Sequence, residues 1–487
     1  MSPDKNRNPT SGQLWGRFAH LLSAQGWEGL LSALFFIYLA WLDKQAFGEV
    51  MYAIAAGSLA KEAVRFGLYY PTVARMGRAD GVDSAAIVRD VNWLKTGLLV
   101  LVMGVTAGVM ILGDFSPRLV WIVCLVCLGF GLEAQAETFF SDMRMDGRQD
   151  REARIRSLAV LIGYGYGLAS AALGWSPVLI SLFMVLYGGI MLVAGMLTFA
   201  RKHPHALSAR PVPDRLKRLF TTSVVYAVID NLGTLYNRAN VFFLEKTDSI
   251  DSVAVYSAAW NIVDSISRLV SVQFLGWVVF PVLATLWWND RDRVRPLMRT
   301  NTRWMLVIAF PLMFVLHEES ALIIRALYPD GFDQAVPVQR YLVWAIPFTF
   351  LGNLFGYFMI TTGALRHLFM IYLLVTVLNL VFNALLVPTM GLAGACLVIV
   401  LTKGCMTILT FSYCVVRHRL LHPGDIFFPL ALAGGALAVY ALLSQLLPMR
   451  LASLLTLALY GGLVWKPGLG IMDIPGRQNI PPAGKPG

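Results

Sequence analysis

The sequence contains few charged residues. Asp, Glu, Lys and Arg make up 14% of its 487 residues, whereas soluble domains carry about 25%. The chain is 57% hydrophobic, with 28 Phe and 13 Trp, and its mean hydropathy is +0.63. So little charge excludes a water-soluble multidomain enzyme, and so many large apolar side chains exclude a disordered or collagen-like chain. A polytopic membrane protein is the class that remains.

Catalytic and metal-binding motifs are also scarce. All five cysteines lie in apolar runs, and the C-x-x-C at Cys124 and Cys127 has no second pair with zinc spacing. We therefore interpret the cysteines as small packing residues and predict neither a metal site nor a cofactor. The sequence has no P-loop and no G-x-S-x-G motif, which disfavours a membrane-embedded glycosyltransferase or ligase. It also has no filter-forming segment, which disfavours a channel.

Apolar stretches of about 20 residues predict fourteen transmembrane helices, because a helix of that length crosses the hydrocarbon core of a bilayer. The first stretch is longer than the apolar region of a signal peptide, so we expect it to be retained. The sequence thus predicts an all-α polytopic membrane protein. The predicted helices cover residues 17–42, 46–72, 94–113, 118–139, 155–174, 177–200, 216–244, 252–284, 303–325, 340–361, 366–388, 391–416, 426–447 and 450–466.

Basic residues gather on alternate connections between these helices. Of the 40 Lys and Arg, 29 fall on one set of connections and the two tails, and six fall on the other set. Cytoplasmic loops are enriched in Lys and Arg, so both termini are predicted to be cytoplasmic. This asymmetry accounts for most of the net charge of +11, and we predict no nucleic-acid partner. The six residues on the outer set are Lys44, Arg118, Lys246, Arg325, Arg340 and Arg450.

A polar, proline-containing break at residues 201–218 divides the predicted helices into groups. We predict a six-helix bundle at 1–200, a basic cytoplasmic linker at 201–218, a second six-helix bundle at 219–420, and a helix pair with a cytoplasmic tail at 421–487. Similar patterns start the second and eighth helices. Tyr52-Ala53 with Arg65 and Pro71 matches Tyr256-Ser257 with Arg268 and Pro281. Matching halves are typical of secondary transporters, whose binding sites lie between repeats.

Eleven ionisable residues fall inside predicted helices, where each would cost about 3 kcal/mol at a lipid-facing helix centre. They must therefore face protein, one another or water, and we expect a hydrated central cavity. Five are basic and six are acidic, so their count alone does not fix the charge of that cavity. They are Glu28, Lys61, Glu62, Arg65, Glu133, Glu137, Asp230, Arg238, Asp264, Arg268 and Lys403.

The spacing of these residues suggests their roles. Lys61 and Arg65 share one helix face, as do Asp264 and Arg268, because each pair is four residues apart. Arg offers a fork of donors that matches phosphate oxygens. We predict an anion-binding set of Lys61, Arg65, Asn237, Arg238, Arg268 and Lys403, and we predict Asp230 and Asp264 as ion-coupling residues.

A structural interpretation of the same charges remains open. The pairs Glu62–Arg65 and Asp264–Arg268 can neutralise one another without any ligand. Glu133 and Glu137 lie near the end of the fourth predicted helix and can be peripheral. Their presence beside the basic residues would weaken the anion-binding hypothesis.

Three segments of the chain resemble bacterial polysaccharide flippases. The first runs Tyr236-Asn237-Arg238-Ala239-Asn240 to Leu244 and continues at Val255-Tyr256-Ser257-Ala258-Ala259; the second is Leu327-Tyr328 to Phe332; the third is Asn379 to Asn383 with the P-x-x-G-x-x-G-A run at Pro388–Ala395. In order and layout the sequence is similar to O-antigen and exopolysaccharide flippases of the multidrug/oligosaccharidyl-lipid/polysaccharide exporter superfamily.

This resemblance implies two six-helix bundles around a cavity that opens alternately to each side of the bacterial inner membrane. The implied substrate is an undecaprenyl-diphosphate-linked oligosaccharide, and the implied partners are membrane lipids and a polysaccharide polymerase or export complex. Relatives line the cavity with Arg residues that correspond to Arg65 and Arg268. Many carry Asp where this chain has Asn240, which puts ion coupling at that position in doubt. Relatives commonly have twelve helices, so the last pair is an extension. A cation-coupled multidrug exporter of the same superfamily is the alternative.

Overall fold

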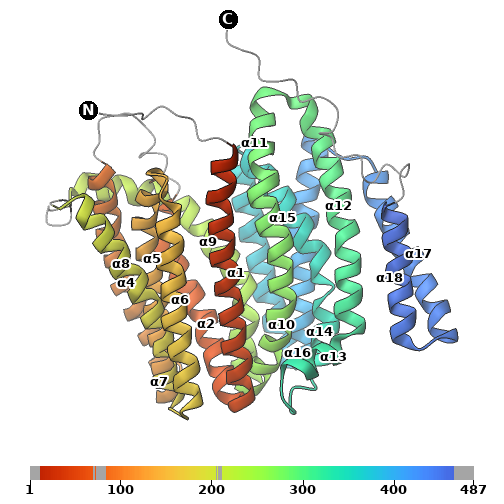
Figure 1. Cartoon of the computed structure of the whole chain (residues 1–487), viewed down its shortest axis with the longest axis horizontal. Coiled ribbons are helices and arrows are strands. Elements are labelled where there is room, and N and C mark those ends of the chain that lie inside the picture. The colour runs from red at the N-terminus through yellow and green to blue at the C-terminus, as the bar shows by residue number, and fades with distance from the viewer. Residues whose placement is uncertain (1–10, 70–71, 73–83, 205, 207–210, 466–487) are drawn as a thin grey trace, which may run out of the picture. The chain divides into compact units, whose positions relative to one another are not determined.

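The computed structural model describes residues 11–69, 72, 84–204, 206 and 211–465 (Figure 1). All regular secondary structure in these ranges is helical, which confirms the predicted fold class. The chain divides into two compact units, residues 1–254 and 255–487, which are described separately below. Several residues of the sequence argument lie outside the described ranges, namely Pro71, Arg75, Arg78, Arg210 and the basic residues of the two tails.

The helices of the first unit lie side by side (Figure 1). Their N-terminal ends carry local start signals. Asp43 accepts hydrogen bonds from the backbone N–H groups of Gln45 and Ala46 at the start of α2, and Ser116 caps α5, which begins at Pro117. The elements are α1 (Ser11–Leu42), α2 (Lys44–Arg65), α4 (Ser84–Leu112), α5 (Pro117–Met145), α6 (Gln149–Ala172), α7 (Pro177–Ile180), α8 (Leu182–Lys202) and α9 (Pro213–Thr247).

The second unit begins within α10 and contains several bent spans. Two α-helical segments enclose a π-helix, η1, and α12 meets α13 at an angle of 66°. Its elements are α10 (Ile250–Arg268), η1 (Leu269–Val279), α11 (Phe280–Asn289), α12 (Arg291–Glu318), α13 (Ser320–Leu327), α14 (Ala335–Leu342), α15 (Ala345–Thr361), α16 (Leu365–His418), α17 (Gly424–Leu446) and α18 (Met449–Trp465).

Helical segments occupy all fourteen ranges predicted as transmembrane helices. By length and composition alone, eight described helices can cross a membrane, or nine when the bent α12–α13 pair counts as one span. α2 and α9 are absent from this stricter count because charged and amide side chains interrupt their apolar sequence, and α18 is only 17 residues long. The interrupting charges include Lys61, Glu62, Arg65 and Asp230, which are among the eleven ionisable residues predicted to lie inside helices, and Glu49 of α2, which is not.

The predicted helix at 46–72 ends earlier than its apolar sequence suggests. α2 stops at Arg65 because Phe66 and Gly67 adopt left-handed backbone conformations, with φ of 49° and 59°. A Cβ atom at position 67 would lie 2.6 Å from the backbone N of Ala227, so only glycine permits this approach of the chain to α9. Arg65 therefore lies in the last turn of a helix rather than in the middle of a span.

Two other predicted helices are joined in the structure. The ranges 366–388 and 391–416 form the single element α16, which bends at Gly391, where φ is 54° and ψ is −128°. The Pro388–Ala395 run that carries the family resemblance is thus a kink within one continuous element. Proline removes a backbone donor, and glycine adopts the left-handed conformation without steric cost.

The core of the first unit is built around α5, which packs against α2, α4 and α8. Phe139, Phe140 and Phe183 are completely buried within it. Gly188 of α8 lies against the backbone carbonyl of Gly129 on α5, so closely that a Cβ atom would overlap it. Such small-residue contacts let transmembrane helices approach closely, and they hold α5 where its carboxylates face α2.

The C-terminal helix pair packs on α12. Phe310 and Phe314 of α12 form an apolar cluster with Ala436 of α17 and Tyr460 of α18. The hydroxyl of Tyr460 donates a hydrogen bond of 2.9 Å to the carbonyl oxygen of Val307. The extension beyond twelve helices is therefore an integral part of the second unit.

An ion cluster fastens the start of α17 to α12. Asp425 is fully buried. Its carboxylate forms ion pairs with Arg299 Nε at 2.7 Å and with Arg303 Nη2 at 2.6 Å. The backbone N–H of His422 also donates to this carboxylate, at 2.8 Å. Charge-assisted hydrogen bonds from two arginines compensate the cost of burying one carboxylate.

Candidate functional site

Two basic side chains of α2 meet two glutamates of α5 inside the first unit. Lys61 Nζ lies 2.6 Å from Oε1 of Glu133 and 3.6 Å from Oε1 of Glu137. Arg65 donates two hydrogen bonds to Glu137, from Nε to Oε2 at 2.8 Å and from Nη2 to Oε1 at 2.6 Å. Glu137 thus bridges Lys61 and Arg65, and the two forked contacts fix the guanidinium plane.

A third glutamate completes this group, which we call the α2–α5 ion network: Lys61, Glu62, Arg65, Glu133 and Glu137. Arg65 Nη1 donates to Oε1 of Glu62 at 2.8 Å. Glu133 is 5% exposed, and the side chain of Arg65 is 31% exposed. Burial of these charges is tolerated because each has a partner of opposite sign.

The α2–α5 ion network changes the expected role of Arg65. Three carboxylates surround two cations, so the network has no excess of positive charge. Glu133 and Glu137 are direct partners of the basic residues rather than peripheral groups. An anion that binds Arg65 must therefore displace Glu137, which weakens the idea that Arg65 is a free phosphate ligand.

Lys95 belongs with this network, although it is one of the 29 basic residues counted above on the predicted cytoplasmic side. It is 4% exposed, and its Nζ donates a hydrogen bond of 2.6 Å to the carbonyl oxygen of Ala134 on α5. The charges of Glu137 and Arg65 lie close enough to act on it. Lys95 falls inside the predicted helix 94–113, and that position was the signal for an internal role.

α9 carries three of the predicted site residues, Asp230, Asn237 and Arg238, and a further asparagine, Asn231. Asn231 and Asn237 each donate a side-chain hydrogen bond to the carbonyl four residues earlier, at 2.8 and 2.7 Å. Asp230 is half-buried and lies within electrostatic range of Glu62 and Arg65. It makes no hydrogen bond or ion pair within the described residues, whereas Arg238 is half-buried on the same helix.

In the second unit, Asp264 and Arg268 form the pair that their spacing predicts. Arg268 Nε lies 3.2 Å from Oδ2 of Asp264, and the two side chains are 57% and 18% exposed, respectively. Over the described part of the chain, the terminal amino groups of Arg268 have no other ion pair. This guanidinium is therefore more accessible to an anion than that of Arg65.

A π-helix follows Arg268 directly. η1 covers Leu269–Val279, and its Ser271 accepts a hydrogen bond of 2.9 Å from Asn353 on α15. π-helical turns are rare and frequently occur at functional sites. Nothing in the sequence predicts this element, because its residues lie within one long apolar stretch.

Lys403 lies beside a buried polar cluster on the two arms of α16. Asn379 donates a hydrogen bond of 2.9 Å to Oγ1 of Thr402, and Asn383 donates to the backbone and side-chain oxygens of Asn379. Asn379, Asn383 and Thr402 are fully buried, and Lys403 is 7% exposed. The two asparagines entered the sequence argument only through the family resemblance, and the cluster shows that they join the arms of the bent element.

The structure therefore groups the predicted site residues by unit. The first unit holds Lys61 and Arg65 in one network, with Asp230, Asn237 and Arg238 on α9. The second holds the pair Asp264–Arg268 and, on α16, Lys403. No group of three His, Cys, Asp or Glu with metal-binding geometry occurs among the residues that the structure describes.

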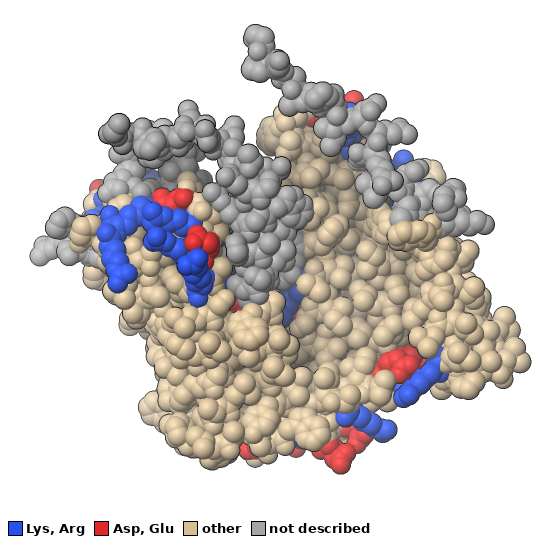
Figure 2. Space-filling view, in the orientation of Figure 1, with Lys and Arg blue, Asp and Glu red and all other residues tan. Residues whose placement is uncertain are grey.

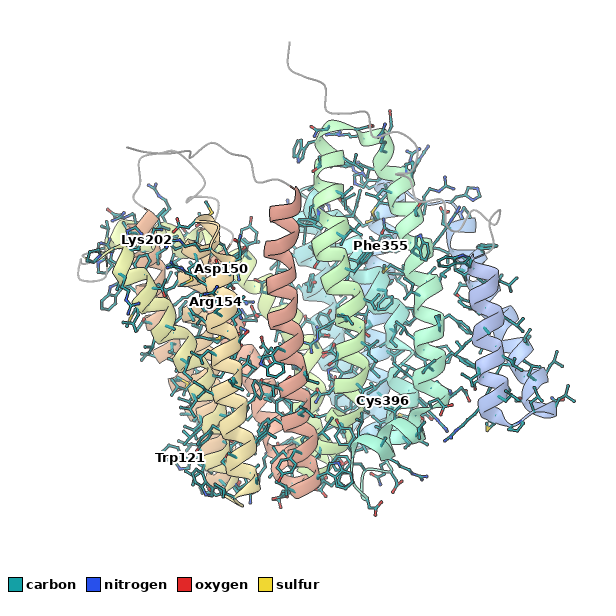
Figure 3. All side chains as sticks on the ribbon, in the orientation of Figure 1. Trp121, Asp150, Arg154, Lys202, Phe355 and Cys396 are labelled. Atoms are coloured by element: carbon teal, nitrogen blue, oxygen red, sulfur yellow. The ribbon has the colours of Figure 1, made fainter. Side chains whose placement is uncertain are left out.

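The two ends of the first unit differ in charge. Lys and Arg gather at one end (Figure 2), where Figure 3 places Arg154, Asp150 and Lys202, whereas Trp121 lies at the opposite end. The carboxylates at the basic end are largely occupied: Glu152 is buried against Arg144 at 2.6 Å. Exposed arginines at this end include Arg148, Arg151, Arg154, Arg201 and Arg218.

Comparison with protein families gives one match. The model of a family described as "Polysaccharide biosynthesis protein" matches residues 39–337, which is more than half of the chain. No match was found among curated proteins.

Several solved structures share the fold. The lipid II flippase MurJ, in an inward closed conformation, aligns with a TM-score of 0.69 and 11% identity, over 91% of this chain and 98% of that chain. An inward-facing multidrug resistance MATE family transporter of the MOP superfamily aligns with a TM-score of 0.63 and 14% identity. The alignment covers 80% of this chain and 94% of that chain. A MOP superfamily transporter from Pyrococcus furiosus aligns with a TM-score of 0.53 and 16% identity, over 83% of this chain and 94% of that chain. These three proteins are described as one flippase and two transporters.

Proposed function

The chain belongs to the polysaccharide biosynthesis protein family, and from that premise we propose that it flips a lipid-linked oligosaccharide across a membrane. The substrate is an oligosaccharide on undecaprenyl diphosphate, moved by alternating access from the cytoplasmic to the periplasmic leaflet of the bacterial inner membrane. Polysaccharide biosynthesis and export, through a polymerase or export complex, would consume the translocated product.

The family match is the observation that carries this proposal. The fold supports it, because a lipid II flippase aligns over 91% of the chain. A lipid flippase moves a lipid with its polar head group across the membrane. Polar groups cannot cross hydrocarbon without protein or water around them. The intramembrane charges of both units are consistent with a polar path.

Arg268 is the first candidate for contact with the diphosphate. Its side chain is 57% exposed and uses only Nε in its contact with Asp264, so the rest of the guanidinium fork can bind phosphate oxygens. Arg65 can contribute after Glu137 is displaced. We propose Arg238, Lys403, Lys61 and Asn237 as further substrate contacts.

Asp230 and Asp264 are proposed as ion-coupling residues. Asp230 is half-buried near Glu62 and Arg65, and Asp264 is paired with the guanidinium proposed to hold the anion. Intramembrane carboxylates of transporters often carry protons or cations. Binding of a cation at Asp264 would compete with Arg268, which links the ion to the substrate.

The charge asymmetry of the first unit supports the proposed orientation. The end with Arg154 and Lys202 is the one that the sequence assigns to the cytoplasm, and the opposite end carries Trp121 (Figure 3). Both termini are accordingly proposed to be cytoplasmic. The domain limits at 200, 218 and 420 remain proposals of the sequence argument.

A cation-coupled multidrug exporter is the second candidate. One observation favours it: three carboxylates, Glu62, Glu133 and Glu137, lie together in the α2–α5 ion network, and carboxylates are the groups that bind organic cations. MATE family transporters also share the fold.

A reconstitution experiment separates the two. The full chain is inserted into liposomes with a fluorescent undecaprenyl-diphosphate disaccharide as probe, and access of the disaccharide to an external lectin is followed over time. We expect translocation with the wild-type chain and a strong decrease with Arg268→Ala. The matched control is Arg293→Ala, which removes an exposed arginine from a similar Asp–Arg pair.

Ethidium efflux is measured in the same vesicles. Ethidium transport without disaccharide translocation would overturn the proposal in favour of the exporter. Equal translocation by wild type and Arg268→Ala would contradict the role given to Arg268.

A further inference from the structure

A small cavity lies at the Trp121 end of the first unit, away from the α2–α5 ion network. Its volume is about 230 Å³, and its walls come from the start of α2, the α4–α5 connection and the end of α9. Typical pockets for drug-sized ligands measure roughly 300–1,000 Å³. This cavity therefore suits a ligand of the size of one monosaccharide. The residues that matter below are Gln45, Glu49, Asp114, Phe115, Glu245 and Lys246.

One wall of the cavity is an immobilised aromatic ring. Phe115 packs against Tyr52 with ring centroids 5.9 Å apart, and Lys246 Nζ lies 5.8 Å from the Phe115 centroid. Tyr52 is held in turn by Phe242, edge to face, at 5.4 Å. An aromatic face fixed in this way offers an apolar platform beside charged groups.

The polar wall contains three carboxylates, and two of them, Asp114 and Glu245, can accept hydrogen bonds from a ligand. Glu49 is 4% exposed and already accepts a hydrogen bond of 2.8 Å from Arg118 Nε. Oε2 of Glu245 is buried without a hydrogen-bond partner. The carboxylate of Asp114 makes no hydrogen bond or ion pair among the described residues. The buried Oε2 of Glu245 is costly without a partner, whereas Asp114 is exposed and open to a donor from a ligand.

Asp114 lies directly after the end of α4. Its φ of 56° is in the left-handed region, and the backbone N–H groups of Asp114 and Phe115 donate to the carbonyl oxygens of Ile111 and Met110, at 3.3 and 3.4 Å. Helices commonly end in this way, and here the end of α4 brings Asp114 into the cavity wall.

The chemistry of the walls selects the ligand class. A metal ion is disfavoured because no metal-binding group of three occurs in the described ranges and because Lys246 lines the same space. A sugar ring fits instead, since it presents C–H groups on one face and hydroxyl donors around its edge. The ring face would lie on Phe115, and the hydroxyls would donate to Asp114 and Glu245.

We propose that this cavity binds one sugar residue of the transported oligosaccharide, with Asp114 and Glu245 as hydrogen-bond acceptors and Phe115 as the stacking surface. The inference rests on the proposed function for the identity of the ligand. All three connections that form the cavity belong to the set predicted to lie outside the cytoplasm. The site would therefore recognise the sugar on the periplasmic side and give that step its saccharide specificity.

Saturation-transfer NMR with the full chain in detergent micelles tests this. The probes are free N-acetylglucosamine, glucose, galactose, mannose and rhamnose. We expect at least one sugar to bind the wild type and to bind Asp114→Asn or Glu245→Gln roughly tenfold more weakly, because each change removes a charged acceptor. Asparagine tolerates the left-handed conformation, so Asp114→Asn keeps the backbone intact.

Asp251→Asn is the matched control, because this exposed carboxylate lies at the same end but outside the cavity wall. Its sugar binding should equal that of the wild type. Binding of none of the sugars by the wild type, or equal binding by all variants, would overturn the proposal. If the wild type binds calcium but none of the sugars, and both cavity variants lose the calcium, the cavity is a cation site and the proposal is wrong.

The two proposals fail in different ways. If the chain binds sugar through Asp114 and Glu245 but translocates no lipid-linked probe, the proposed flippase function is wrong and the proposed sugar site stands. Translocation by a chain that binds no sugar would refute the site and leave the flippase.

Discussion

Among individual residues, accessibility separates two arginines that the sequence treats as equivalent. Arg65 and Arg268 each lie three or four residues from an acid on their own helix, and both of these pairs form. Only Arg65 gains a second carboxylate from another helix, because Glu137 lies 72 positions away in the chain. Local spacing can reveal the first kind of contact but not the second.

A double-mutant cycle tests the role of Arg65. Arg65→Ala should destabilise the chain by roughly 3 kcal/mol, since it leaves Glu137 buried with only a 3.6 Å contact to Lys61. Arg65→Ala combined with Glu137→Ala should recover much of that loss. The measurements are thermal unfolding in detergent and polymer export in cells. If the double variant also recovers export, Arg65 is structural and contacts no substrate.

Asp264→Asn should impair transport with little effect on stability. Arg268 is 57% exposed in its pair with Asp264, and ion pairs with an exposed partner contribute at most about 1 kcal/mol. Transport by the reconstituted chain is measured with and without a proton or sodium gradient. Asp290→Asn, which alters a comparable exposed pair with Arg293, is the control. A gradient dependence that survives in Asp264→Asn would remove this residue from ion coupling.

Among elements, apolar length predicted where helices occur but not how they end or bend. All fourteen predicted ranges contain helix, because burial of apolar side chains in lipid and the need to satisfy backbone hydrogen bonds both favour it. The element η1 lies within one apolar run from α10 to α11, and the early end of α2 depends on the approach of Gly67 to α9. Tertiary contacts of this kind leave no periodic signal in the sequence.

Gly67→Ala should be strongly destabilising. The new Cβ atom would lie 2.6 Å from atoms of Tyr226 and Ala227, and φ at this position is 59°. Gly165→Ala in α6 is the matched control, because no atom lies within 4 Å of the added Cβ and alanine raises helix propensity by about 1 kcal/mol. Thermal unfolding of both variants provides the comparison. Equal stability of the two would refute the close approach of residue 67 to α9.

For the whole molecule, the charge pattern predicts orientation more directly than it predicts function. The alternation of basic connections assigns Arg154 and Asp248 to opposite sides of the membrane, and the two ends of the first unit differ accordingly (Figure 2). The same sequence offers no comparable rule for substrate identity. The flippase proposal depends on family membership instead.

Cysteine labelling in cells tests the orientation. In a variant whose five cysteines are replaced by alanine, Asp248→Cys should react with a membrane-impermeant maleimide from the periplasm. Arg154→Cys should react only after the inner membrane is opened. Both positions are exposed, so access depends on the side of the membrane alone. The reverse pattern would invert the predicted topology, and with it the periplasmic position of the sugar cavity.

The contact between Asp425 and α12 has a consequence for biosynthesis. Arg299, Arg303 and the apolar face of α12 are synthesised more than a hundred residues before the helix pair that covers them. During translation, α12 must therefore remain in the membrane with two arginines lacking their carboxylate. The arrival of α17 neutralises them and buries Phe310 and Phe314. Completion of the chain thus covers the basic and apolar surface that α12 presents before α17 and α18 are made.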